Sequence, residues 1–168
     1  IPYFLDWLNI RKYLEIIVDW TKIGNYWVLY LSIPYKKRAI PLFWRVVDYT
    51  TDEDWQNTIE RECLEVFIGL VPFILRPKII IIGDRGYGKV EFFKFLKGLG
   101  VNFAMRVKAD VWVESRNFSG KLRAFRFGAR KVRWWQDVLY HKTKKERLNI
   151  LLKYESKDPI YIGLNAKC

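Results

Sequence analysis

The apolar run of residues 79–82, four consecutive isoleucines closed by Gly83-Asp84, constrains the fold more than any other stretch. Such a run, closed by a turn residue, predicts a fully buried strand. A short helix is predicted after it over Lys89–Lys97, followed by a strand over Asn102–Val107. A buried strand placed among helical segments predicts a fold of the α/β class.

Three further strands are predicted before the isoleucine run. They cover Leu14–Val18, which ends in Asp19, then Tyr26–Ile33 and Arg38–Val47. Short turns join them, so they are expected to form an antiparallel meander. Pro41 in the third strand indicates the edge of a sheet, because proline lacks a backbone donor.

A helix is predicted between this meander and the isoleucine run. Thr50 and Glu53 have the spacing of a capping box at its start, and Pro72 stops it. One apolar helical stripe is predicted from Trp55, Ile59, Cys63, Val66, Phe67 and Leu70. Cys63 is therefore expected to be a small buried core residue.

Composition limits the class of protein. A chain of 168 residues has room for one domain and a sizeable insertion. The formal charge is −1 over residues 1–84 and +13 over residues 85–168, which indicates a polyanion as partner. Two cysteines allow no disulfide framework and favour a reducing compartment. The most apolar run, Val66–Leu75, falls short of the roughly 20 residues that cross a bilayer.

The basic half alternates short aromatic strands with basic loops from residue 110 onward, which predicts an inserted β subdomain. Solvated faces of lysine-rich proteins can look similar, but the loops hold more charge than solubility requires. Phosphate contacts of this kind give DNA affinity without sequence preference. The lone His141, with two distant cysteines, makes no zinc site and is expected on the surface. The candidate DNA-binding residues of this half are Arg85, Lys89, Arg123, Arg126, Arg130, Lys131 and Arg133.

The segment Gly83–Val90 has two interpretations. As G-x-x-x-x-G-K between a strand and a helix, it is nearly a phosphate-binding P-loop. Val90 stands where that motif needs a hydroxyl for Mg²⁺. The other interpretation makes Asp84 a metal ligand at the end of a central strand, with Asp19 ending a second buried strand in the same way. Two such acids can bridge divalent cations, although each could simply cap the turn that follows it.

Three phrases resemble the DDE transposases of bacterial and archaeal insertion sequences, in the insertion-sequence-four group. They are Asp19-Trp20-Thr21, residues 38–42 (Arg-Ala-Ile-Pro-Leu) and residues 84–88 (Asp-Arg-Gly-Tyr-Gly). The resemblance implies an RNase H-like, mixed five-stranded sheet with flanking helices, in which the first and fourth strands are neighbours. It assigns residues 1–109 to the catalytic core and residues 110–168 to a basic β-rich insertion.

The same resemblance implies cleavage and 3′-hydroxyl strand transfer at transposon ends, with Asp19 and Asp84 holding Mg²⁺ or Mn²⁺. It implies DNA as partner, both transposon ends and target, a homodimer on that DNA, a cytoplasmic, nucleoid-associated location and no membrane. The family's third acid lies in Tyr-x-x-Arg-x-x-x-Glu-x-x-x-x-x-x-Lys, which does not occur after residue 110. We therefore expect a fragment whose third acid lies beyond Cys168. A DNA-binding remnant without catalysis and a P-loop nucleotide binder stay open as alternatives.

Overall fold

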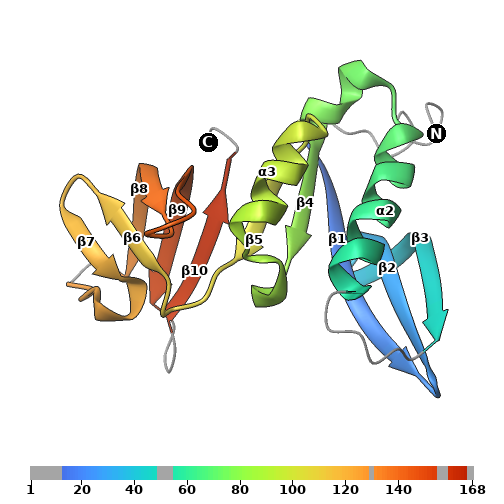
Figure 1. Cartoon of the computed structure of the whole chain (residues 1–168), viewed down its shortest axis with the longest axis horizontal. Coiled ribbons are helices and arrows are strands. Elements are labelled where there is room, and N and C mark those ends of the chain that lie inside the picture. Colours follow the sequence, from blue (N-terminus) through green and yellow to red (C-terminus); the bar gives the residue numbers. More distant parts are fainter. Residues whose placement is uncertain (1–12, 49–54, 129–130, 155–158, 166–168) are drawn as a thin grey trace. The chain divides into compact units, whose positions relative to one another are not determined.

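Figure 1 shows the computed structural model of the chain, which describes residues 13–48, 55–128, 131–154 and 159–165. The chain divides into two compact units, residues 1–82 with 97–101 and residues 83–96 with 102–168. Each unit is described by itself below. No helix in the described ranges is long and apolar enough to cross a membrane.

The first unit contains a sheet of the order β3-β2-β1-β4. The meander β1 (Leu14–Ile23), β2 (Tyr26–Tyr35) and β3 (Arg38–Asp48) is antiparallel, as predicted. The isoleucine strand β4 (Ile79–Gly83) pairs in parallel with β1. The expectation that the first and fourth strands are neighbours is thus confirmed.

The edge position of β3 is also confirmed. This strand ends the order of the sheet, and Pro41 lies opposite Ser32 where a bulge shifts the register. A proline at this place leaves no ladder donor missing toward another strand.

The helix α2 (Trp55–Gly69) packs against the strands of the meander (Figure 1). The rings of Phe67 and Phe43 lie 6.0 Å apart between α2 and β3. The predicted stripe is wrong in part, because Val66 and Leu70 are more than half exposed. Leu64 and Ile68 are fully buried in their place.

Two further predictions concern this helix. Cys63 is buried, as expected, and burial raises the pKa of its thiol to about 11. The capping box of Thr50 and Glu53 lies outside the described residues. After the helix, Pro72 begins the 3₁₀ turn η1 (Phe73–Lys78), which leads into β4.

The second unit is an antiparallel sheet of the order β5-β10-β9-β8-β6-β7, with one helix. Its strands are β5 (Asn102–Arg106), β6 (Trp112–Ser115), β7 (Phe118–Lys121), β8 (Val132–Tyr140), β9 (Glu146–Tyr154) and β10 (Pro159–Leu164). The remaining elements are η2 (Arg85–Tyr87), α3 (Val90–Gly98) and η3 (Leu122–Ala124).

The mixed α/β class is confirmed, but the prediction of five strands is wrong. Ten strands are described, β1–β4 in the first unit and β5–β10 in the second. The expected aromatic strands in the basic half are present as β6, β8 and β9. β9 pairs with β10, and β8 pairs with β9, so these strands belong to the same sheet as β10 and do not form a sheet of their own. The number of strands in the sheet is therefore larger than predicted. The boundary at residue 109 stays a prediction.

Phe93 of α3 holds the core of the second unit together. Its ring stacks on Phe103 of β5 at 4.7 Å and meets Tyr140 of β8 edge-on at 5.4 Å. Gly163 of β10 makes room, because a Cβ there would lie 2.9 Å from Cδ1 of Leu148. The helix that follows Asp84 is therefore fixed on this sheet.

Candidate functional site

Asp84 follows the last residue of β4 and caps η2. Its Oδ1 accepts a hydrogen bond of 2.7 Å from the backbone N–H of Gly86. The side chain is exposed, and among the described residues no group donates to its Oδ2. The expectation that Asp84 caps the following turn is confirmed.

Close packing explains the glycines around Asp84. A Cβ on Gly83 would lie 2.8 Å from both the Met105 Sδ and Cδ2 of Tyr87. A Cβ on Gly88 would lie 3.0 Å from the backbone oxygen of Arg106. The backbone thus runs tightly against β5 before and after the turn.

The P-loop interpretation fits this geometry poorly. A P-loop directs its backbone N–H groups at phosphate oxygens. Here the N–H of Gly86 donates to the carboxylate of Asp84 instead. A carboxylate at that place would also repel a phosphate group.

Asp19 lies inside β1, so the predicted end of that strand at Asp19 is wrong. The strand continues to Ile23, because β2 pairs with it as far as Ile23 opposite Tyr26. The Asp19 side chain is exposed, and its Oδ1 accepts from the N–H of Trp20 at 2.9 Å. The alternative that Asp19 caps a turn at Thr21-Lys22 is wrong too, since both residues belong to β1.

The sequence did not predict a hydrogen bond between α2 and Trp20, the residue next to Asp19. The indole Nε1 of Trp20 donates to Oε1 of Glu60 on α2 at 2.8 Å, and Glu60 is buried. The Trp20 ring also meets that of Trp55 at 5.3 Å. One sign of this contact was present in the sequence. Glu60 lies at helical spacing from Leu64 and Phe67, so an acid stands on the apolar face of α2, where it needs a polar partner. This contact fixes the part of β1 that carries Asp19.

The two acids belong to different units, Asp19 to the first and Asp84 to the second. Within the described ranges, no group of three or more His, Cys, Asp or Glu side chains is placed to hold a metal ion. Each acid is thus an exposed carboxylate with one oxygen engaged by a backbone N–H.

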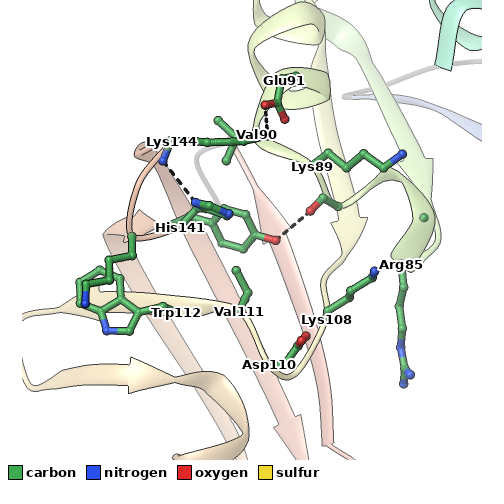
Figure 2. A pocket seen from close by; sticks show the side chains of 14 residues that line it. Arg85, Lys89, Val90, Glu91, Lys108, Asp110, Val111, Trp112, His141 and Lys144 are labelled. Atoms are coloured by element: carbon green, nitrogen blue, oxygen red, sulfur yellow. Dashed lines mark hydrogen bonds and ion pairs between the residues drawn. The ribbon is translucent and has the colours of Figure 1, made fainter. Parts of the chain in front are cut away.

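A basic pocket of about 390 Å³ lies in the second unit beside the Asp84 loop (Figure 2). It brings together the predicted residues Arg85 and Lys89. Three lysines that sequence reasoning missed also line it, Lys108, Lys142 and Lys144. Segments near residues 85, 110 and 141 converge here, so no local pattern could have shown the pocket.

Two contacts hold the walls of the basic pocket. The Tyr140 hydroxyl donates to the backbone oxygen of Gly88 at 2.8 Å, and burial raises the pKa of this phenol. Lys144 forms an ion pair with Glu91, which lowers the pKa of the Glu91 carboxyl (Figure 2). His141, expected on the surface, lines this pocket and is half-buried.

Three of the other predicted basic residues, Arg123, Arg126 and Lys131, line a second cavity of about 550 Å³, the aromatic groove. It is lined by Arg123, Phe125, Arg126, Phe127, Gly128, Lys131, Tyr154, Pro159 and Tyr161. Arg133 of β8 is half-buried, and its guanidinium lies near Gly128. Arg130 lies outside the described residues.

Basic and aromatic residues line both cavities, and such a concentration of positive charge is typical of the class of proteins that bind polyanions. Residues 46–160 match the family model for the transposase DDE domain. The chain belongs to this family, whose members are transposases that act on DNA. The match includes Asp84 and all seven predicted basic residues, and Asp19 precedes it. No curated protein matches the chain significantly.

Proposed function

We propose that the chain carries two catalytic acids of a DNA transposase of the insertion-sequence-four group, with an RNase H-like core. In this proposal Asp19 and Asp84 bind Mg²⁺ or Mn²⁺ for cleavage at transposon ends and 3′-hydroxyl transfer into target DNA. The register of β1 against β4 carries the proposal. Its last pair is Ile17 opposite Ile82, and each acid stands two residues further along the chain.

The donor chemistry of the two acids fits such a cation. Mg²⁺ is held by one or two carboxylates, keeps several waters and takes substrate phosphate oxygens as further ligands. Both carboxylates are exposed, and in the described part of the chain neither Oδ2 accepts a hydrogen bond. When bound, the cation would polarise the scissile phosphate and lower the pKa of an attacking water or hydroxyl.

The backbone bonds to the two acids would prepare them for this task. Each Oδ1 is fixed by an N–H group, from Trp20 at Asp19 and from Gly86 at Asp84. The Trp20–Glu60 contact further restrains β1 at Asp19. Carboxylates held in this way lose less rotamer freedom when they bind a cation.

The basic residues of the second unit would supply affinity for DNA. In this proposal the aromatic groove and its margin contact backbone phosphates, with a homodimer of the chain on the paired transposon ends. Such contacts are independent of base sequence and weaken steeply with salt. The residues proposed for them are Arg123, Arg126, Arg130, Lys131 and Arg133.

The test is metal-dependent strand cleavage with transposon-end DNA. We expect residues 1–168 to bind DNA but to cleave it negligibly, and the chain extended to the expected third acid to cleave it. Asp19→Asn and Asp84→Asn should each abolish cleavage by the extended chain while DNA binding persists. Glu15→Gln is the matched control, because Glu15 is an exposed acid of β1 at the same alternation as Asp19. Cleavage that survives either aspartate substitution would contradict the proposal.

A DNA-binding remnant is the second candidate function. It is favoured by the absence of a three-acid cluster within the described ranges. Two carboxylates hold one cation and leave a two-metal site incomplete. If the extended chain binds DNA and stays inert with Mn²⁺, this second candidate is the better account.

A further inference from the structure

We infer that the basic pocket binds a backbone phosphate group of the DNA substrate. The inference rests on the proposed function, since it takes DNA as the partner. It adds Lys108, Lys142 and His141, which no sequence pattern indicated. The phosphate contact inferred here is a second one, in addition to the phosphate contacts proposed for the aromatic groove.

The charges in the pocket do not balance without an anion. The Lys144–Glu91 pair neutralises itself, and Asp110 is the one other acid that lines the pocket. The other basic residues of the lining are Arg85, Lys89, Lys108 and Lys142, so with Asp110 counted against them the lining keeps an excess of three positive charges.

In the described part of the chain, Arg85, Lys108 and Lys142 make no ion pair and no side-chain hydrogen bond. Like charges that line one pocket repel one another. A bound phosphate would offset that repulsion with charge-assisted hydrogen bonds.

The shape of the pocket suits a phosphate group on a chain. Figure 2 shows Arg85, Lys89 and Lys108 on one side and Lys144, His141 and Trp112 on the other. A volume of about 390 Å³ exceeds that of a single ion and reaches the size of small-ligand sites. The pocket can thus admit a phosphate together with its neighbouring sugar.

His141 can add a neutral donor to this set. Its Nδ1 accepts from the backbone N–H groups of Lys144 at 3.2 Å and Thr143 at 3.4 Å. With Nδ1 acting as the acceptor, the neutral ring carries its proton on Nε2. The ring can therefore donate to a phosphate oxygen without being charged.

The pocket is linked to the candidate catalytic acid through one short loop. Arg85 is the first residue of the turn that Asp84 caps, Lys89 follows that turn, and the Tyr140 hydroxyl donates to the backbone oxygen of Gly88 between them. A phosphate bound here would lie on the strand that Asp84 is proposed to act on. The phosphate group in question is thus a diester on the same DNA strand as the cleaved one.

The test is DNA affinity of the 168-residue chain with EDTA present, so that metal binding does not enter. Lys108→Gln/Lys142→Gln is compared with Lys94→Gln/Lys121→Gln, which removes the same charge from exposed lysines outside both cavities. Fluorescence anisotropy of a labelled duplex is followed over a salt series, and thermal melting checks that both variants fold.

One lost phosphate contact should lower the log–log salt slope by about 0.9, which is about an eightfold weaker affinity near 0.1 M salt. The control should lose clearly less. A neutral methylphosphonate at the bound position should weaken the wild type and leave the pocket variant unchanged. Equal losses in the pocket variant and the control overturn the inference.

The phosphate could also belong to a free nucleotide or to inorganic phosphate. That source predicts that inorganic phosphate or a mononucleotide raises the Tm of the wild type, while the DNA salt slope is unchanged in the pocket variant. This result would overturn the assignment to DNA. The outcome does not depend on Asp19 or Asp84, so the proposed catalysis can fail while the pocket assignment stands, and the reverse.

Discussion

Replacing Gly83 by alanine tests whether packing holds the Asp84 loop as closely as the structure shows. The new Cβ would lie 2.8 Å from the Met105 Sδ and from Cδ2 of Tyr87. Met105 is fully buried and Tyr87 is 4% exposed, so neither side chain can move into solvent. The thioether of Met105 can bend aside, but the Tyr87 ring is rigid and must shift as a whole. Overpacking of this kind costs about 1–3 kcal/mol of unfolding free energy.

Thermal melting can measure this loss, because each kcal/mol moves the Tm of a chain of this size by about 2–4 °C. Gly98→Ala is the matched control. Gly98 is the last residue of α3, and a Cβ there meets nothing within 4 Å. Alanine should be neutral there or stabilise by up to about 1 kcal/mol. A Gly83→Ala variant that melts with or above the Gly98→Ala variant would refute the packing argument.

Two further predictions concern contacts beside the candidate acids. Trp20→Phe leaves the buried Glu60 carboxyl without its indole donor, so urea denaturation should show a loss of about 1.5–3 kcal/mol. Glu60→Gln keeps an oxygen that can accept this bond, so it should lose less unfolding free energy than Trp20→Phe. An equal loss in the two variants would contradict the assignment of this stability to the Trp20–Glu60 hydrogen bond. Lys144→Gln should remove about 0.2–1 kcal/mol, since the ion pair with Glu91 is half exposed. Because the pKa of Glu91 is lowered from 4.5, the difference from wild type should be full above pH 4.5 and vanish as pH falls through the folded pKa. A difference that is constant across this range would contradict the assignment.

The sheet of the first unit could largely be predicted, because local patterns specify it. Short turns and alternating aromatic residues define the meander, and the isoleucine run defines β4. The length of β1 could not be predicted, since Thr21, Lys22 and Ile23 include no apolar run. Pairing with β2 extends the strand through these residues, which is a tertiary effect.

The helix α2 shows the limit of periodicity. The spacing from Trp55 to Leu70 fits several rotations of a helix, and the prediction chose one that includes Val66. The buried face of α2 includes Cys63 and Phe67 of the predicted stripe, but it continues through Leu64 and Ile68 and leaves Val66 exposed. Two apolar stripes that are shifted by about one residue around the helix have nearly the same spacing. Which of them is buried depends on the surface against which the helix packs.

Parts of the candidate site could likewise be predicted where they depend on neighbouring residues, and could not where they depend on distant ones. The cap of the turn by Asp84 could be predicted, because all the residues involved are neighbours in the chain. The basic pocket joins three distant segments, so only the excess of positive charge could hint at it. Likewise β7 was missed, since Phe118-Ser119-Gly120-Lys121 has no strand pattern and is paired through β6.

The loop from Asp84 to Lys89 has the glycine spacing of a phosphate-binding loop, yet it would contact phosphate differently. A P-loop uses backbone N–H groups, whereas here the N–H of Gly86 holds a carboxylate. Arg85 and Lys89 line the basic pocket, whereas within the described residues Asp84 is not part of its lining. One loop therefore carries residues of the proposed phosphate site and, outside the lining of that site, the carboxylate of Asp84. Because Tyr140 fixes the loop at Gly88, a phosphate in the pocket and the orientation of Asp84 would depend on the same short stretch of backbone.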